Sequence, residues 1–292
     1  MAKYKIKDLE ALTGIKSHTI RIWEKRYNLL EPNRTDTNLR LYSDRDLQDI
    51  LLVNLLNRNG FKISKIADLN REERIRRASN LDTTESVETG ISKLIYALVE
   101  MDENAFDQII KELVDDLGLE KALGEYVFPF LERIGVMWLA DTITIAQEHF
   151  ISMLIRQRLI GEIDKLEFEP DGHFKAALLY LPENEWHELG LLCYHYILKK
   201  KNWQIFYLGQ STPIEAVREV CLKKEVNLIV SAWVSHMDTK LVQLHFKHIR
   251  SFYQGAIAVG GSHSAMFDGI DAFRIAQIND LSFFADQIKS QI

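Results

Sequence analysis

The chain has 292 residues, 47% of them hydrophobic, and a formal net charge of −6. This length exceeds that of most single domains and provides for more than one hydrophobic core. The two cysteines fall in predicted helices and indicate neither a disulfide framework nor a metal site. No apolar run is long enough to cross a bilayer and the first residues include no apolar signal region, so we expect a cytoplasmic protein.

Positive charge is concentrated near the N-terminus. Residues 1–77 hold 17 Lys and Arg against 11 Asp and Glu, a net charge of +6, so the remaining chain holds 19 against 31, a net charge of −12. A basic N-terminal segment followed by an acidic remainder of the chain indicates that only the first domain binds a polyanion.

The first predicted elements form a helix-turn-helix. Residues 6–13 have helical apolar spacing and stop at Gly14, a residue suited to a helix C-terminus. Ser17 can cap a second helix over residues 19–26, which would enter the DNA major groove. The polar segment 31–40 is predicted to form a wing. Three side chains of the second helix share one face: His18, Arg21 and Lys25.

Residues 19–27, Thr-Ile-Arg-Ile-Trp-Glu-Lys-Arg-Tyr, followed by Pro32 and Tyr42-Ser43, resemble the winged helix of MerR-type transcription regulators. The similarity covers about residues 1–75, including 59–66, which resemble the family's second helix pair. It implies a DNA-binding domain over residues 1–75. As an alternative to DNA contacts, the cations of the helix and wing are solvated surface residues. The DNA contacts implied by the resemblance are His18, Arg21, Lys25, Arg34 and Arg40.

The middle of the chain is predicted to be helical. Residues 71–83 are polar and charge-dense, which indicates a linker or a helix tail, and we place the linker at residues 76–83. Beyond it there is almost no strand or turn signal as far as about residue 165. Four helical blocks predict a four-helix bundle over residues 84–165: 84–101, 103–116, 119–136 and 142–164.

The last part of the chain alternates between strands and helices. Strands are predicted near residues 175–181, 203–208, 226–232, 255–260 and 272–276, and helices near 188–200, 213–224, 238–252 and 283–291. This alternation predicts a flavodoxin-like, Rossmann-type open sheet over residues 172–292. Such α/β sheets bind ligands at the carboxyl ends of their strands.

The loop after the first of these strands has the sequence Glu185-Trp-His187-Glu-Leu-Gly190. An imidazole there can coordinate a metal, and Glu185 can accept the proton of the other ring nitrogen and raise the basicity of His187. Gly190 lets another body approach the backbone closely. The pattern resembles the Asp-x-His-x-x-Gly signature of cobalamin-binding domains, with Glu185 in place of the Asp.

Three further motifs follow in the order that such domains use: residues 207–213, Ser231-Ala-Trp233 and Val259-Gly260-Gly261-Ser262. The resemblance implies that His187 is the lower axial ligand of cobalt and that the later motifs lie around the corrin and its nucleotide tail. Gly260 and Gly261 would allow backbone contact with that tail. At the position of Trp233 the family more often has a smaller apolar residue, so this indole either stacks on the nucleotide base or fills its pocket.

The bundle carries a pattern of its own, Trp138 followed ten and eleven residues later by Glu148 and His149. Taken alone, it is compatible with a core tryptophan and an exposed helical pair. Over the whole chain, the order of domains is similar to that of the light-responsive, adenosylcobalamin-dependent MerR-type repressors of carotenoid synthesis. That resemblance implies that Trp138 lies over the upper corrin face and that Glu148 and His149 hold the adenosyl group. In light-sensing relatives a His can directly follow this Trp, whereas Leu139 stands here.

The resemblance implies a transcription regulator and not an enzyme. Adenosylcobalamin would fix the bundle against the α/β domain and favour a homo-oligomer, a dimer or a tetramer, that binds a double-stranded DNA operator until light breaks the cobalt–carbon bond. Leu139 and Trp233 leave open a cobalamin-free or light-independent regulator that answers to a protein partner or another ligand. A corrinoid methyl carrier is a further alternative, disfavoured because such a carrier has no use for a DNA-binding head.

Overall fold

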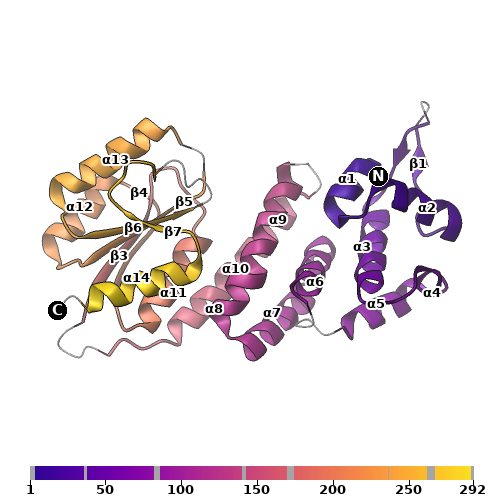
Figure 1. Ribbon diagram of the computed structural model, residues 1–292, viewed down its shortest axis with the longest axis horizontal. Coiled ribbons are helices and arrows are strands. Elements are labelled where there is room, and N and C mark those ends of the chain that lie inside the picture. Colours follow the sequence, from indigo (N-terminus) through magenta and orange to yellow (C-terminus); the bar gives the residue numbers. More distant parts are fainter. Residues whose placement is uncertain are drawn as a thin grey trace. The chain divides into compact units, whose positions relative to one another are not determined.

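The computed structural model describes residues 4–35, 38–81, 86–139, 143–169, 174–235, 237–261 and 267–290. The chain forms two compact units, residues 1–151 and 152–292 (Figure 1). Within the described ranges, the first unit is helical apart from a short hairpin and the second contains a five-stranded sheet. No helix among these residues is long and apolar enough to cross a membrane.

Helices α1 (Ile6–Thr13) and α2 (Ser17–Tyr27) form the predicted helix-turn-helix. α1 ends at Gly14, whose φ of 70° lies in the left-handed region that glycine adopts without strain. α2 begins at Ser17, two residues before the predicted start, so Ser17 is not the cap that the sequence predicted. The reason is Glu10, which accepts the backbone amide and the hydroxyl of Ser17 at 3.1 and 2.6 Å and so satisfies the start of the helix from outside.

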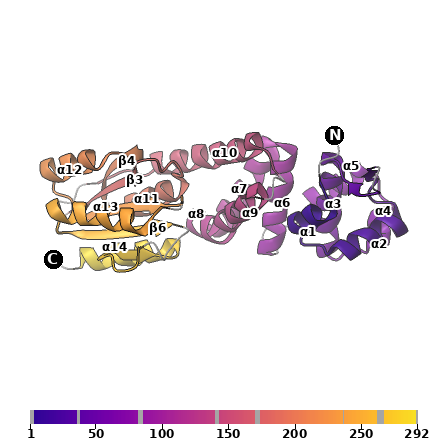
Figure 2. The same ribbon diagram turned by 90° about the horizontal axis from the view of Figure 1, so that it is seen from above.

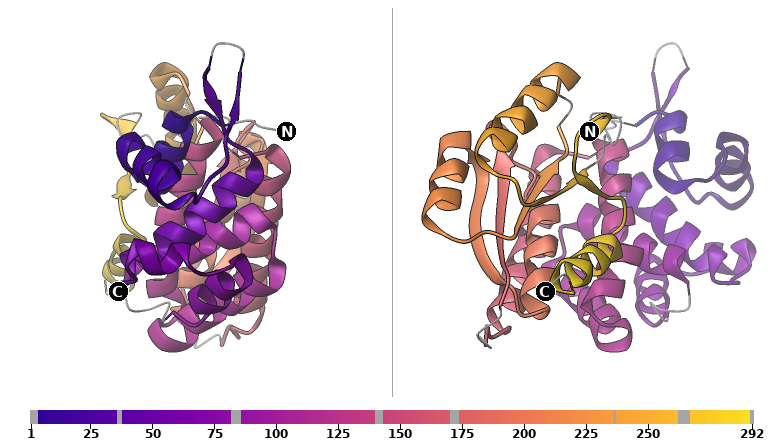
Figure 3. Two further views of the ribbon diagram at one scale, coloured as in Figure 1. Left: turned by 90° about the vertical axis from the view of Figure 1, so that its right-hand side faces the viewer. Right: turned by 60° about the vertical axis from the view of Figure 1, so that its left-hand side comes forward.

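The wing follows as an antiparallel hairpin of β1 (Asn33–Arg34) and β2 (Arg40–Leu41), which projects from the neighbouring helices (Figure 3). The Ser43 hydroxyl accepts the amide of Asp46 and starts the next helix. The predicted linker begins inside α5, and residues 82–85 lie outside the described part. The remaining helices of this head are α3 (Asp44–Arg58), α4 (Ile63–Ala67) and α5 (Arg71–Ser79).

Long helices at the four predicted positions build the central region: α6 (Val87–Glu100), α7 (Glu103–Leu117), α9 (Phe128–Leu139) and α10 (Ile145–Asp164). α6, α7 and α9 lie side by side (Figure 2). The third predicted helix is interrupted, because α8 (Leu119–Ala122) and a π-helical turn over Leu123–Val127 precede α9. Pro129 explains the turn, since its ring would clash with the carbonyl four residues earlier and it has no amide to donate.

The second unit contains the predicted flavodoxin-like sheet. All neighbouring strands are parallel, in the spatial order β4-β3-β5-β6-β7. The chain leaves β3 toward β4 and later returns to the other side of β3, so β3 and β5 border the topological switch point at which such sheets bind ligands. The strands are β3 (Ala176–Pro182), β4 (Gln204–Thr212), β5 (Leu228–Trp233), β6 (Ala256–Gly261) and β7 (Phe273–Ile275).

Helices cover both faces of this sheet, α11 (Leu189–Lys200) and α14 (Ile278–Lys289) on one and α12 (Ile214–Lys223) and α13 (Thr239–Phe252) on the other (Figure 1). Every residue of β3 is buried, as its continuous apolar run predicts. α14 begins earlier than predicted, because Asp280 accepts the amides of residues 276 and 277 and caps the helix.

Candidate functional site

The loops that follow β3 and β5 meet at the switch point. In the first loop, Glu185 accepts the backbone amides of Val234 and Ser235 at 2.9 and 2.7 Å. An oxygen of the same carboxylate lies 2.6 Å from His187 Nδ1. The Glu185 side chain is fully buried, whereas the His187 ring is 61% exposed. Glu185 therefore anchors an exposed imidazole to the end of the sheet.

Hydrogen bonds keep Glu185 ionised. Burial would raise the pKa of its carboxyl, but bonds from the His187 ring and from the amides of Ser235, His187 and Val234 outweigh burial and lower that pKa to about 2. A carboxylate only accepts, so Nδ1 of His187 donates to it. Nε2 is then the nitrogen able to coordinate a metal, and the carboxylate on the far side of the ring strengthens it as a ligand.

Glu188 ties helix α10 to the same loop. Its buried carboxylate pairs with Arg156 of α10 and accepts the hydroxyl of Tyr207 at 3.3 Å. The ring of Tyr207 in turn stacks on His195, with centroids 5.2 Å apart. Sequence reasoning missed Arg156 and Glu188, because an ion pair across 32 positions leaves no local pattern. The one available signal was the position of Glu188 beside His187.

The other residues assigned to the cofactor in this unit lie in the first turn of α11 and in strands β5 and β6. A Cβ at Gly190 would meet no other atom of the described chain within 4 Å, so the fold does not require glycine there and the backbone is open to another body. In β5, Ser231 is fully buried and Trp233 is 2% exposed. Gly260 and Gly261 are the last two residues of β6, and both lie in close contact with other atoms of the chain. Ser262 lies outside the described residues.

The residues assigned to the adenosyl group belong to the first unit. Trp138, in the last turn of α9, is 50% exposed, so it is not the core residue of the alternative interpretation. On α10, Glu148 and His149 pair with each other at 2.6 Å, and the His149 side chain is 71% exposed. Residues 140–142 and the side chain of Leu139 lie outside the described structure.

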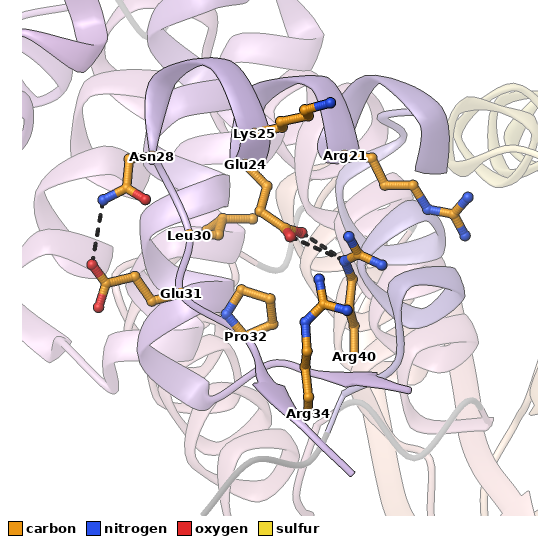
Figure 4. Close-up of a pocket in the computed structure, with 9 residues that line it drawn as sticks. All are labelled: Arg21, Glu24, Lys25, Asn28, Leu30, Glu31, Pro32, Arg34 and Arg40. Carbon is orange, nitrogen blue, oxygen red and sulfur yellow. Dashed lines mark hydrogen bonds and ion pairs between the residues drawn. The ribbon is translucent and has the colours of Figure 1, made fainter. Parts of the chain in front are cut away.

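Helix α2 and the wing border an open pocket of about 770 Å³ (Figure 4). In its lining, Arg40 Nε donates to both carboxylate oxygens of Glu24 at 3.0 Å. The hydroxyl of the buried Tyr42 donates to the same carboxylate at 3.1 Å. Arg34 donates to Asn38 at 2.6 Å. The lining residues are Arg21, Glu24, Lys25, Asn28, Leu30, Glu31, Pro32, Arg34 and Arg40.

Four of the five residues assigned to DNA therefore surround one pocket, and His18 is exposed on α2 without lining it. The α2 face and the wing together present the cations in the arrangement expected for a winged helix. Sequence reasoning missed Glu24, whose carboxylate offsets the charge of Arg40. The single acidic residue within the basic segment of α2 was its only sequence signal.

Within the described ranges, His187 presents an exposed imidazole at the end of the sheet. Among the described residues there is no cluster of three or more His, Cys, Asp or Glu side chains able to hold a metal ion. His187 alone does not suit a bare ion, but it suits a metal whose remaining ligands come from a macrocycle. Among the other histidines of this unit, His245 lies 2.7 Å from the Tyr180 hydroxyl, and His236 and His263 fall outside the described part.

Comparison with known proteins decides the family. Residues 4–73 match the family model of the MerR HTH regulatory proteins, and residues 91–160 match a model described as the B12 binding domain. The HTH-type transcriptional repressor CarH of Myxococcus xanthus is 32% identical over 220 residues, which cover 73% of this chain and 72% of CarH. The chain belongs to this family of MerR-type, B12-binding transcription regulators. The B12-binding match falls on helices α6 to α10.

Two other similarities agree with this assignment. The repressor CarA of Myxococcus xanthus is 29% identical over 233 residues, covering 79% of this chain and 76% of CarA. The monomethylamine corrinoid protein of Methanosarcina barkeri has a TM-score of 0.56 and 17% identity, covering 67% of this chain and 96% of that structure, which shows a shared fold alone. As a member of the family, the chain is a DNA-binding, cobalamin-binding regulator rather than an enzyme.

Proposed function

We propose that this regulator is a repressor that binds a DNA operator as a homo-oligomer while adenosylcobalamin is bound, and that light releases it. The observation that carries the proposal is the Glu185–His187 pair at the switch point of the sheet, in a chain that begins with a winged helix. The two relatives named as repressors, CarH and CarA, support the sign of regulation. Cytoplasmic placement stays a prediction.

In this proposal each side chain has a separate task. His187 coordinates cobalt through Nε2 while Glu185 holds the ring, and Gly190 lets the corrin approach the backbone. Trp138 presents an exposed flat ring that can exclude water from the upper ligand, and Glu148 can accept hydrogen bonds from ribose hydroxyls. Cobalamin supplies, when bound, a cobalt–carbon bond that visible light can break.

On DNA, Arg21 and Lys25 of α2 enter or flank the major groove, and Arg34 of the wing contacts phosphate. Joining several heads in one oligomer raises the apparent affinity for repeated half-sites through effective concentration. Loss of the oligomer is then enough to release the operator.

The test uses the full chain mixed with adenosylcobalamin in darkness. Size-exclusion chromatography with visible absorption reports bound corrinoid and mass, and gel retardation with a selected genomic operator fragment reports DNA affinity. We expect corrinoid to co-elute with an oligomer in darkness, and green light to reduce both the mass and the operator affinity. His187→Ala should lose the corrinoid, whereas the control His248→Ala, at an exposed histidine of α13, should retain it.

The other outcomes separate the remaining candidates. Corrinoid that co-elutes with no effect of light on mass or affinity identifies a cobalamin sensor, a result that Leu139 after Trp138 favours because no imidazole stands there to take the upper cobalt position. Absence of any retained corrinoid identifies a regulator that answers to another ligand or to a protein partner.

A further inference from the structure

The carboxyl ends of β5 and β6 adjoin the proposed cobalt ligand, and side chains of the protein fill the interior beneath them. Trp233 is the residue immediately before the two amides, of Val234 and Ser235, that hold Glu185. The end of β5 therefore lies beside the loop whose His187 would hold a corrin.

Trp233 is packed on the α13 side of the sheet. Its indole is 2% exposed and contacts the rings of His245, Phe246 and Phe267, with centroids 5.1, 5.6 and 6.2 Å away. His245 is itself fixed by Tyr180 of β3, whose hydroxyl lies 2.7 Å from Nε2. An aromatic cluster thus occupies the space between β5 and α13.

The opposite face is closed as well. A Cβ at Gly260 would lie 2.0 Å from the hydroxyl oxygen of Tyr194, which reaches across from α11. Gly261 has a φ of 140°, and a Cβ there would lie 1.7 Å from the backbone oxygen of Trp233. The two glycines lie against atoms of the chain itself, so as far as the described residues go they leave no space for a ligand.

This packing conflicts with one part of cobalamin. The molecule carries a nucleotide base on its lower face, and when a protein imidazole takes the lower cobalt position that base must be accommodated elsewhere. The exposed ring of His187 fits the cobalt, but the interior formed by the described residues beside it has no room for a planar base while Trp233 and Tyr194 keep their positions. Close-packed interiors accept extra groups only by displacing others.

We propose that Trp233 excludes the nucleotide base, so that the domain recognises the corrin ring and its axial ligands and selects corrinoids that carry no such base. The inference rests on the proposed function in that His187 is taken as the cobalt ligand. Cobalamin binds with its tail outside the sheet or after displacement of the indole. In either case the tail adds little to the binding affinity.

Unpartnered polar atoms do not overturn this inference. The Ser231 hydroxyl and Trp233 Nε1 are buried without a hydrogen-bond partner among the described residues, which by itself could suggest an absent base. However, Nε1 of Trp203 is equally buried and unpartnered among these residues, and Trp203 packs on the other face of the sheet. An unpartnered indole nitrogen in this unit is thus no mark of a base-binding pocket.

The experiment compares two corrinoids on the full chain in darkness. Visible absorption titrations with adenosylcobinamide, which lacks the nucleotide, and with adenosylcobalamin give the two dissociation constants. We expect the natural chain to bind the cobinamide at least as tightly as the cobalamin. Trp233→Leu should tighten cobalamin binding by about tenfold and leave cobinamide within about twofold, because only the nucleotide gains space.

The matched control is Trp203→Leu, which removes an equally buried indole on the opposite face and should not change the ratio of the two constants. A natural chain that binds cobalamin about tenfold more tightly than cobinamide overturns the inference and leaves the cofactor assignment intact. Retention of neither corrinoid by the natural chain or by Trp233→Leu overturns both. The comparison on the natural chain does not depend on the folding of any variant.

Discussion

Glu185 Oε1 lies 2.6 Å from Nδ1 of His187, and the other oxygen of the same carboxylate accepts the amides of Val234 and Ser235. One buried side chain thus orients an exposed imidazole and joins the loop after β3 to the loop after β5. A Glu reaches one methylene further than the Asp of the resembled signature, and here that reach lets it hold both loops.

The first prediction concerns this pair. Glu185→Gln keeps the size of the side chain but removes its charge, so the His187 ring loses the partner that raises its basicity and fixes its tautomer. We expect corrinoid affinity to fall by about 10- to 100-fold, the range typical for loss of a partner of a metal-ligating histidine. Visible absorption titration measures the change. Glu183→Gln, at an exposed position of the same loop, is the control, and an equal loss in both variants would contradict the role of Glu185.

The local parts of the site were predictable from sequence. The apolar run before Pro182 predicts β3 and the loop after it, and a parallel sheet then places Glu185 and His187 at a ligand-binding edge. The spacing of α2 likewise places Arg21 and Lys25 on one face. These predictions succeed because each signal lies within a short window of the chain.

Contacts between distant segments were not predictable in this way. The acceptance of the Ser235 amide by Glu185 spans 50 positions, and the pair of Glu24 with Arg40 spans 16. The sequence left two possibilities open for Trp233, stacking on a base or filling its pocket. Which of them holds depends on side chains from β3 and α13, and only the tertiary packing brings these side chains around the indole.

The second prediction concerns the wing. Arg34→Ala removes a cation that lines the pocket, so operator affinity should fall and the magnitude of the negative slope of log K against log salt should decrease by about 1. Fluorescence anisotropy on an operator duplex at several salt concentrations measures both. Arg218→Ala, at an exposed position of α12, should change neither, and an unaltered slope for Arg34→Ala would place this arginine away from phosphate.

The third prediction concerns Glu24, whose replacement should strengthen DNA binding, whereas replacement of Arg34 should weaken it. Its carboxylate accepts from Arg40 and Tyr42 and adds a negative charge beside the other cations that line the pocket. Glu24→Gln keeps an acceptor but removes that charge, so we expect tighter binding to DNA of any sequence and a salt slope that is steeper by up to about 1. The same anisotropy titrations on a non-operator duplex report this gain. Weaker binding there would mean that Glu24 acts chiefly by holding Arg40 in place.

The fourth prediction concerns the ion pairs that join the DNA-binding head to the helices after it. Glu88 of α6 accepts from Arg58 of α3 at 2.6 Å and from Arg133 of α9 at 3.0 Å. The three side chains are 26 to 42% exposed, so solvent screens the bridge, and Glu88→Gln should lower the free energy of unfolding of the first unit by no more than about 1 kcal/mol.

Urea denaturation of the full chain at two salt concentrations measures this loss, which high salt should reduce. Glu132→Gln, on the exposed surface of α9, is the control and should have no effect. In a double-mutant cycle, Arg58→Gln should couple with Glu88→Gln. If the double variant loses the sum of the two single losses, the bridge contributes nothing to stability.

The fifth prediction follows from two half-buried histidines in the α/β unit. Burial, together with the smaller effect of the nearby charges of Lys199 and His248 respectively, lowers the pKa of His195 and of His245 from 6.5 to about 4. Each folded-state pKa lies below the unfolded value. The free energy of unfolding therefore has its full value above about pH 6.5 and decreases as the pH falls from there toward 4. At pH 5 the loss should be about 1 to 2 kcal/mol per histidine.

Hydrogen exchange of the amides of β3, the strand that is buried along its whole length, reports this unit alone. Their protection, corrected for the intrinsic effect of pH on exchange, should decrease between pH 7.5 and pH 5. His195→Phe keeps a ring against Tyr207 but cannot take a proton, so it should remove about half of the pH dependence. His18→Gln, on the exposed face of α2, should leave the pH dependence unchanged. Protection of β3 that is independent of pH over this range would show that both histidines can be protonated without cost to the fold.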